Sequence, residues 1–170
     1  RTSKRRQLIL ATLMVVGIMF AGPLSLKAGQ SCRIPHPMTP PNPQFQGQCP
    51  NCGMVRAMWA RTWMTFENSG GRSEACSLHC LADVALKSGE TPQHVQVALY
   101  TKPEAMHPAE SAFFVVGSSA RGTMTMQSKI AFADRAAAEQ FSQSCGGEVA
   151  TFATALGLAR QGVPRENKVI

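Results

Sequence analysis

An apolar run lies near the start of the chain, over residues 8–22. The basic stretch Lys4-Arg5-Arg6 precedes this run, and Pro23, which a helix interior does not tolerate, follows it. A run of fifteen residues is short for a membrane span, which needs roughly 20. The pattern is typical of a secretory signal, with a cut after Ala28.

Residues 1–28 are therefore predicted to be a signal peptide or a membrane anchor. The anchor results if the apolar stretch extends to Leu26 and is not cut. In both cases the body of the protein is expected to be periplasmic or otherwise extracytoplasmic, and to touch a membrane only through this segment.

The next stretch, residues 29–48, loses the hydrophobic pattern and holds five prolines. This composition predicts an extended linker. At the other end, residues 163–170 are polar and predict a loose tail. The folded domain is expected over residues 49–162.

Within this domain the hydrophobic pattern predicts the same series of elements twice. In the first copy, about 49–103, turn residues at 68–71 separate two strands, and Ser77 begins a helix. The predicted elements are strands at 55–66 and 72–76, a helix at 77–87 and a strand at 93–101.

The second copy, about 110–156, has the same order. Asp134 is the expected N-cap of its helix, and Cys145-Gly146-Gly147 ends it. The predicted elements are strands at 112–117 and 124–132, a helix at 134–141 and a strand at 149–152. The fold class is therefore α+β, with two tandem ββαβ units in one compact body.

Charge narrows the functional classes. The formal net charge is +7, but residues 29–170 hold twelve Lys and Arg against ten acids. No basic stripe with interleaved aromatic residues is present, so a nucleic-acid partner has no support. No nucleophile elbow, phosphate-binding loop or dinucleotide fingerprint occurs either, and the chain is not expected to be an enzyme.

Cysteine spacing gives the strongest chemical signal. Cys49 and Cys52 are separated by two residues and are followed by Gly53, so a tight turn can aim both sulfurs at one point. Cys76 and Cys80 lie at a predicted strand-to-helix junction, where the helix dipole stabilises a thiolate. Two such pairs separated by twenty-three residues predict a metal site.

Three interpretations of these cysteines remain open. A structural zinc site would use all four thiolates in a closed tetrahedron. Disulfides are the usual state of six cysteines in an exported chain, and Cys49 and Cys52 also have the spacing of a redox pair, although no βαβ pattern surrounds them. A Cu(I) site is favoured by nearby thioethers, because thiolate and thioether ligands select Cu(I). The sequence leaves open the redox state of Cys32 and Cys145.

Among the neighbouring soft or nitrogen ligands, three stand out. Met54 follows the first cysteine pair directly, and Met124 lies just after Gly122 on an expected loop edge. His79 lies between the second pair, where a ligand and a solvated residue are equally expected. The candidate metal ligands are Cys49, Cys52, Met54, Cys76, His79, Cys80 and Met124.

At this point a family resemblance appears. Residues 49–155 resemble the NosL family, the accessory proteins of nitrous oxide reductase, which are periplasmic copper chaperones. The resemblance rests on Cys49-Pro50-Asn51-Cys52-Gly53-Met54, Cys76-Ser77-Leu78-His79-Cys80-Leu81, Phe114-Val115-Val116-Gly117-Ser118, Gly122-Thr123-Met124, Ile130-Ala131-Phe132 and residues 138–147.

The resemblance implies a duplicated ββαβ fold and a copper site that uses Cys52, Met54 and Met124. It further implies a copper donor or acceptor as partner, such as nitrous oxide reductase or its maturation transporter. Residues 49–80 alone also resemble the TRASH/YHS metal-binding module. The function expected is a Cu(I) metallochaperone, and the alternative is a structural zinc module that mediates interactions.

Overall fold

The computed structural model describes residue 32 and residues 34–164. The predicted signal, residues 1–28, and most of the predicted tail lie outside the described residues. Within the described part, no helix combines the length and the hydrophobicity that a membrane span requires.

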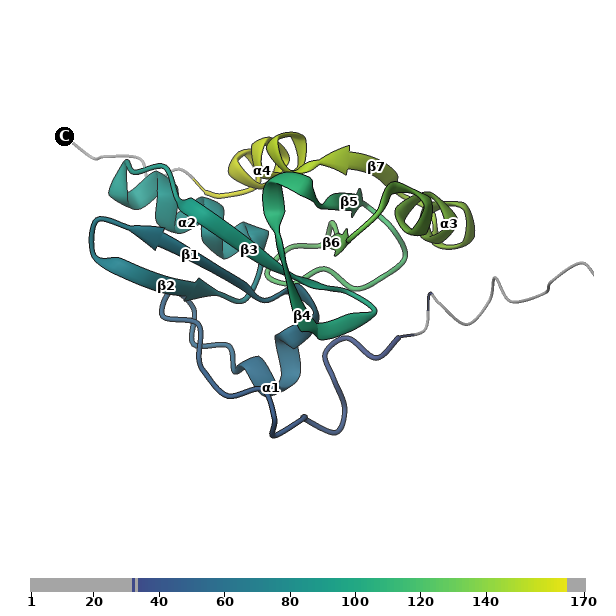
Figure 1. The fold of residues 1–170 in the computed structure, drawn as a ribbon, viewed down its shortest axis with the longest axis horizontal. Helices are drawn as coiled ribbons and strands as arrows, with labels where there is room; N and C mark the ends of the chain where they lie inside the picture. The colour runs from purple at the N-terminus through teal and green to yellow at the C-terminus, as the bar shows by residue number, and fades with distance from the viewer. Residues whose placement is uncertain (1–31, 33, 165–170) are drawn as a thin grey trace, which may run out of the picture.

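The first ββαβ unit is an antiparallel hairpin, a helix and a returning strand (Figure 1). The third strand lies antiparallel to the first, so the second strand is on the outer side. A further strand then pairs with the third. These elements are β1 (Met64–Asn68), β2 (Gly71–Ala75), α2 (Leu78–Ser88), β3 (Gln93–Leu99) and β4 (Lys102–Pro108).

The second unit repeats this arrangement. Its first strand lies between the second and the third, as in the first unit. A C-terminal helix follows directly on the last strand. The elements are β5 (Phe113–Val116), β6 (Lys129–Phe132), α3 (Arg135–Cys145), β7 (Glu148–Thr151) and α4 (Phe152–Gln161).

The two units join head to tail. The strand order is β2-β1-β3-β6-β5-β7, so the third strand of the first unit meets the second strand of the other. The joint is parallel and consists of one residue pair, Leu99 with Ala131. A two-fold relation between the two units would pair like strands. The structure contradicts it.

Strand β5 separates two hydrophobic cores. Phe114 and Val116 on one face pack with residues of the first unit and of α4, while Val115 on the other face packs with residues of α3. Figure 1 shows α2 and α4 side by side and α3 at the opposite end of the molecule. A strand covered on both faces is continuously apolar, as residues 113–116 are.

Several predicted elements differ from those observed. Residues 55–66 were expected to be one strand, but α1 (Arg56–Trp59) and a 3-10 turn, Ala60–Thr62, precede β1. The predicted strand at 124–132 begins only at Lys129. Strand β4 and helix α4 were not predicted.

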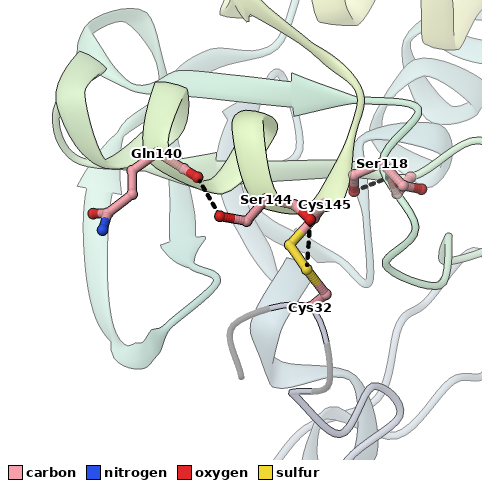
Figure 2. Close-up of a disulfide and its surroundings, with 6 residues drawn as sticks. Cys32, Ser118, Gln140, Ser144 and Cys145 are labelled. Carbon is pink, nitrogen blue, oxygen red and sulfur yellow. Dashed lines mark hydrogen bonds between the residues drawn. A yellow bond between two sulfur atoms is a disulfide. The ribbon is translucent and has the colours of Figure 1, made fainter. Parts of the chain in front are cut away.

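The predicted linker does not extend away from the body. Its described part, residues 34–48, runs past α1 in Figure 1 and makes backbone hydrogen bonds there, from Met38 to Met58 and from Asn42 to Ala57. A disulfide between Cys32 and Cys145 ties the start of this segment to the end of α3 (Figure 2). The segment is thus held at both ends.

Candidate metal centre

The first cysteine pair lies in a tight turn between the N-terminal segment and α1. The backbone N–H of Cys49 donates to the carbonyl of Met54 at 2.9 Å, and that of Gly53 donates to the carbonyl of Cys49 at 2.8 Å. Gly53 has φ +78°, which a side chain would disfavour. The turn folds the chain back on itself, so both sulfurs face the same side.

The second pair joins β2 to α2. Cys76 directly follows the strand, Ser77 is the extended N-cap residue, and Cys80 is in the first helical turn. The free backbone N–H groups of this turn give the helix start a partial positive charge. That charge favours a thiolate at Cys80.

The four sulfurs converge. All lie within 4.8 Å of one another, and the Sγ of Cys76 is 3.5 Å from those of both Cys52 and Cys80. Four thiolates about 2.3 Å from one ion would be roughly 3.8 Å apart in a tetrahedron. The donor set and its spacing therefore fit a soft metal ion.

Burial of the site is uneven. Cys49, Cys76 and Cys80 are buried in the first hydrophobic core, whereas Cys52 is partly exposed. All four thiols are free. An incoming ligand would therefore meet Cys52 first.

Protons are distributed unequally among the thiols. The Cys76 thiol donates to the Cys80 sulfur, and this bond lowers the pKa of Cys80 to about 5. The same bond, with burial, raises the pKa of Cys76. Burial raises the pKa of Cys52 to about 11. The metal-free site is thus expected to hold a thiolate at Cys80, with protons on its neighbours.

A polar cluster links the two cysteine pairs. The side-chain amide of Asn51 donates to Asp83 Oδ2 at 2.8 Å, and Lys87 Nζ lies 2.8 Å from the same oxygen. Asn51 also supports the thiolate of Cys80. These contacts fix the turn of the first pair against α2.

The other predicted ligands are placed differently. Met54 and Met124 line one surface depression together with Trp59 and Met126. Met54 is partly buried against the core that contains the cysteines, and Met124 is 41 % exposed. Met54 precedes β1 of the first unit, whereas Met124 lies between β5 and β6 of the second. The two methionines therefore do not occupy equivalent positions in the two units.

His79 lies on α2, partly exposed, outside the four-sulfur group. Its assignment as a ligand stays a prediction.

A series of buried hydrogen bonds beside the site was not predicted from the sequence. His36, in the predicted linker, is 7 % exposed, and its Nε2 is 2.6 Å from Thr123 Oγ1. Thr123 Oγ1 is 3.0 Å from Thr62 Oγ1, which donates to the carbonyl of Cys76 at 2.8 Å. A histidine among prolines and two isolated threonines form no recognisable pattern.

The molecule is an α+β protein of two tandem ββαβ units. Its four converging thiols are typical of a protein that binds a soft metal ion through cysteine. The NosL family model matches residues 42–155, and the chain belongs to the NosL family. The fold resembles the crystal structure of the copper chaperone NosL from Shewanella denitrificans, with a TM-score of 0.52 and 23% sequence identity. The match covers 64% of this chain and 89% of that one. No curated protein sequence matches the chain.

Proposed function

We propose that this protein binds Cu(I) and delivers it to an acceptor outside the cytoplasm. The observation that carries the proposal is the convergence of four free thiols, one of them partly exposed, beside a depression lined by methionines. Thiolate and thioether sulfur together favour Cu(I) over harder ions. The structural relative described as a copper chaperone supports the same cargo.

Uneven burial supports transfer of the ion rather than permanent storage. A sulfur ligand from an acceptor would add at the Cys52 side and replace the cysteines one after another. The adjacent thioethers of Met54 and Met124 would hold the ion during this exchange. Membership of the NosL family fits such a binding protein better than an enzyme.

The disulfide supports an extracytoplasmic location. A bond such as Cys32–Cys145 persists in oxidising compartments and is rare in the cytosol. The expected export signal leads to the same compartment. The acceptor is proposed to be a copper enzyme such as nitrous oxide reductase, or a transporter in its maturation.

A structural zinc module is the second candidate. Three of the four thiols are buried, as in a closed structural site, and their number completes a tetrahedron. Zinc would then fix the first cysteine turn to α2. The two candidates differ in how much they depend on Met124.

The experiment is competition for metal on the full chain with four free thiols. We expect Cu(I) to bind more tightly than zinc, with release of thiol protons, and Met124→Leu to weaken Cu(I) but not zinc. Met126→Leu is the matched control, because Met126 is 99% exposed. Zinc that resists displacement by Cu(I) would contradict the proposal and favour the structural module.

A further inference from the structure

The loop that carries Met124 is held in a strained form. Met124 has φ +61°, a left-handed conformation that costs a non-glycine residue about 1 kcal/mol or more. A Cβ on the nearby Gly122 would lie 2.0 Å from the carbonyl oxygen of Thr125, so the loop turns tightly back on itself. Such a conformation persists only where the surrounding structure imposes it.

Thr123 supplies the constraint. Its side chain is 3% exposed, although the next residue, Met124, faces solvent. The Thr123 hydroxyl is within hydrogen-bond distance of both His36 and Thr62. One hydroxyl therefore fixes the loop to the N-terminal segment and to the turn before β1.

The number of protons available shows which group donates in each hydrogen bond between His36, Thr123, Thr62 and the Cys76 carbonyl. The Thr62 hydroxyl has one proton and donates it to the Cys76 carbonyl, which can only accept. Thr62 must therefore accept from Thr123, and Thr123 must accept from Nε2–H of His36. The neutral Nε2–H tautomer satisfies all three bonds. It leaves Nδ1 as the acceptor without a partner among the described residues.

His36 itself is firmly enclosed. Its ring lies edge-on to Trp59, with centroids 5.1 Å apart, and to Tyr100, at 5.8 Å. The disulfide at Cys32 and the hydrogen bond from Arg61 to the Pro35 carbonyl fix the backbone on the N-terminal side of His36. His36 is thus a rigid support for Thr123.

We infer that His36, Thr123 and Thr62 are positioning residues that hold Met124 in the depression that it shares with Met54, and so set the affinity of the site for Cu(I). The inference rests on the proposed function, since it requires Met124 to contact the ion. None of the three side chains touches the ion in this scheme. Thr62 also donates to the backbone carbonyl of Cys76, so the test is made at Thr123, whose hydroxyl contacts His36 and Thr62.

The test compares Cu(I) and zinc affinity in Thr123→Val, which has nearly the volume of threonine but no hydroxyl. We expect Cu(I) affinity to fall about tenfold and zinc affinity to stay unchanged. Thr123→Ser restores the hydroxyl and should restore Cu(I) affinity. Thr125→Val is the matched control, because its hydroxyl accepts from the backbone N–H of Gln127 and is not a member of the hydrogen-bond series His36, Thr123 and Thr62.

A double-mutant cycle with Met124→Leu separates positioning from a general structural effect. If Thr123 acts through Met124, Thr123→Val causes no further loss of Cu(I) affinity in the Met124→Leu background. An equal loss in both backgrounds, or no effect of either substitution alone, overturns the inference. Failure of the unsubstituted protein to bind Cu(I) would instead overturn the proposed function.

Discussion

At the scale of single residues, the neutral state of His36 matters for stability as well as for geometry. Burial, together with the charges of Arg61 and Arg121, lowers the pKa of His36 from 6.5 to about 4. The unfolded chain therefore binds a proton between these values that the folded chain does not. The contribution of neutral His36 to the free energy of unfolding is fully present above pH 6.5 and decreases as the pH falls toward 4.

We predict that His36 makes unfolding strongly pH dependent. Between pH 7 and pH 4 its contribution should decrease by about 3 kcal/mol, since one pKa unit corresponds to about 1.4 kcal/mol. Urea unfolding at several pH values should show a shallower dependence in His36→Gln, which keeps an N–H donor and does not titrate. The same slope in both proteins would show that His36 titrates normally.

At the scale of elements, α3 begins with a strong cap. Asp134 accepts a hydrogen bond from the backbone N–H of Ala137 at 2.8 Å. Asp134→Ala should reduce the free energy of unfolding by about 1 kcal/mol, whereas Asp134→Asn should keep most of it. Metal affinity should not change in either variant, because α3 packs in the second core. Equal stability of the two variants in urea unfolding would argue against the cap.

The disulfide acts on the same helix. It closes a loop with a sequence separation of 113 residues and so restricts the unfolded chain strongly. We expect replacement of both Cys32 and Cys145 by alanine to lower the free energy of unfolding by about 2 to 4 kcal/mol. Unfolding of the metal-free protein, followed by tryptophan fluorescence, measures this. An unchanged denaturation midpoint would mean that packing alone holds residues 34–48.

Much of the element order was predictable, because its signals are local. Ser77 and Gly89 border α2, and Asp134 caps α3 as expected. The errors arise where contacts distant in sequence decide. Pro103 and Pro108 argue against a strand, yet β4 lies outside the main strand order, pairs with β3 and tolerates them. Residues 56–62 are apolar enough for a strand, but the N-terminal segment binds them as a helical turn.

In the candidate site, too, features with a local sequence signal were predictable and features that depend on the tertiary fold were not. Cysteine spacing predicted a metal site, and the structure brings these four thiols together. The pairing of Cys32 with Cys145 could not be predicted, because spacing does not determine connectivity. The hydrogen-bond chain through His36 was hidden because its three members come from segments that only the tertiary fold brings together.

At the scale of the whole molecule, export is the main prediction outside the described residues. A reporter fused to the C-terminus should be active only outside the cytoplasm. A fusion after Gln48 would remove the N-terminal segment from the body that it contacts. N-terminal sequencing should find Gly29, or else the chain should remain in the membrane fraction. A soluble, uncut chain in the cytoplasm would contradict both outcomes.

The head-to-tail joint of the two units has a consequence for how such a molecule can grow. A symmetric pair closes on itself, whereas contacts between unlike surfaces close only if their rotation completes a ring. Here unlike strands meet at Leu99 and Ala131, and β2 and β7 remain as unlike ends. A further unit added by gene duplication could therefore join the sheet through the same kind of contact that connects β3 to β6. The strand arrangement itself therefore sets no upper limit on the number of units.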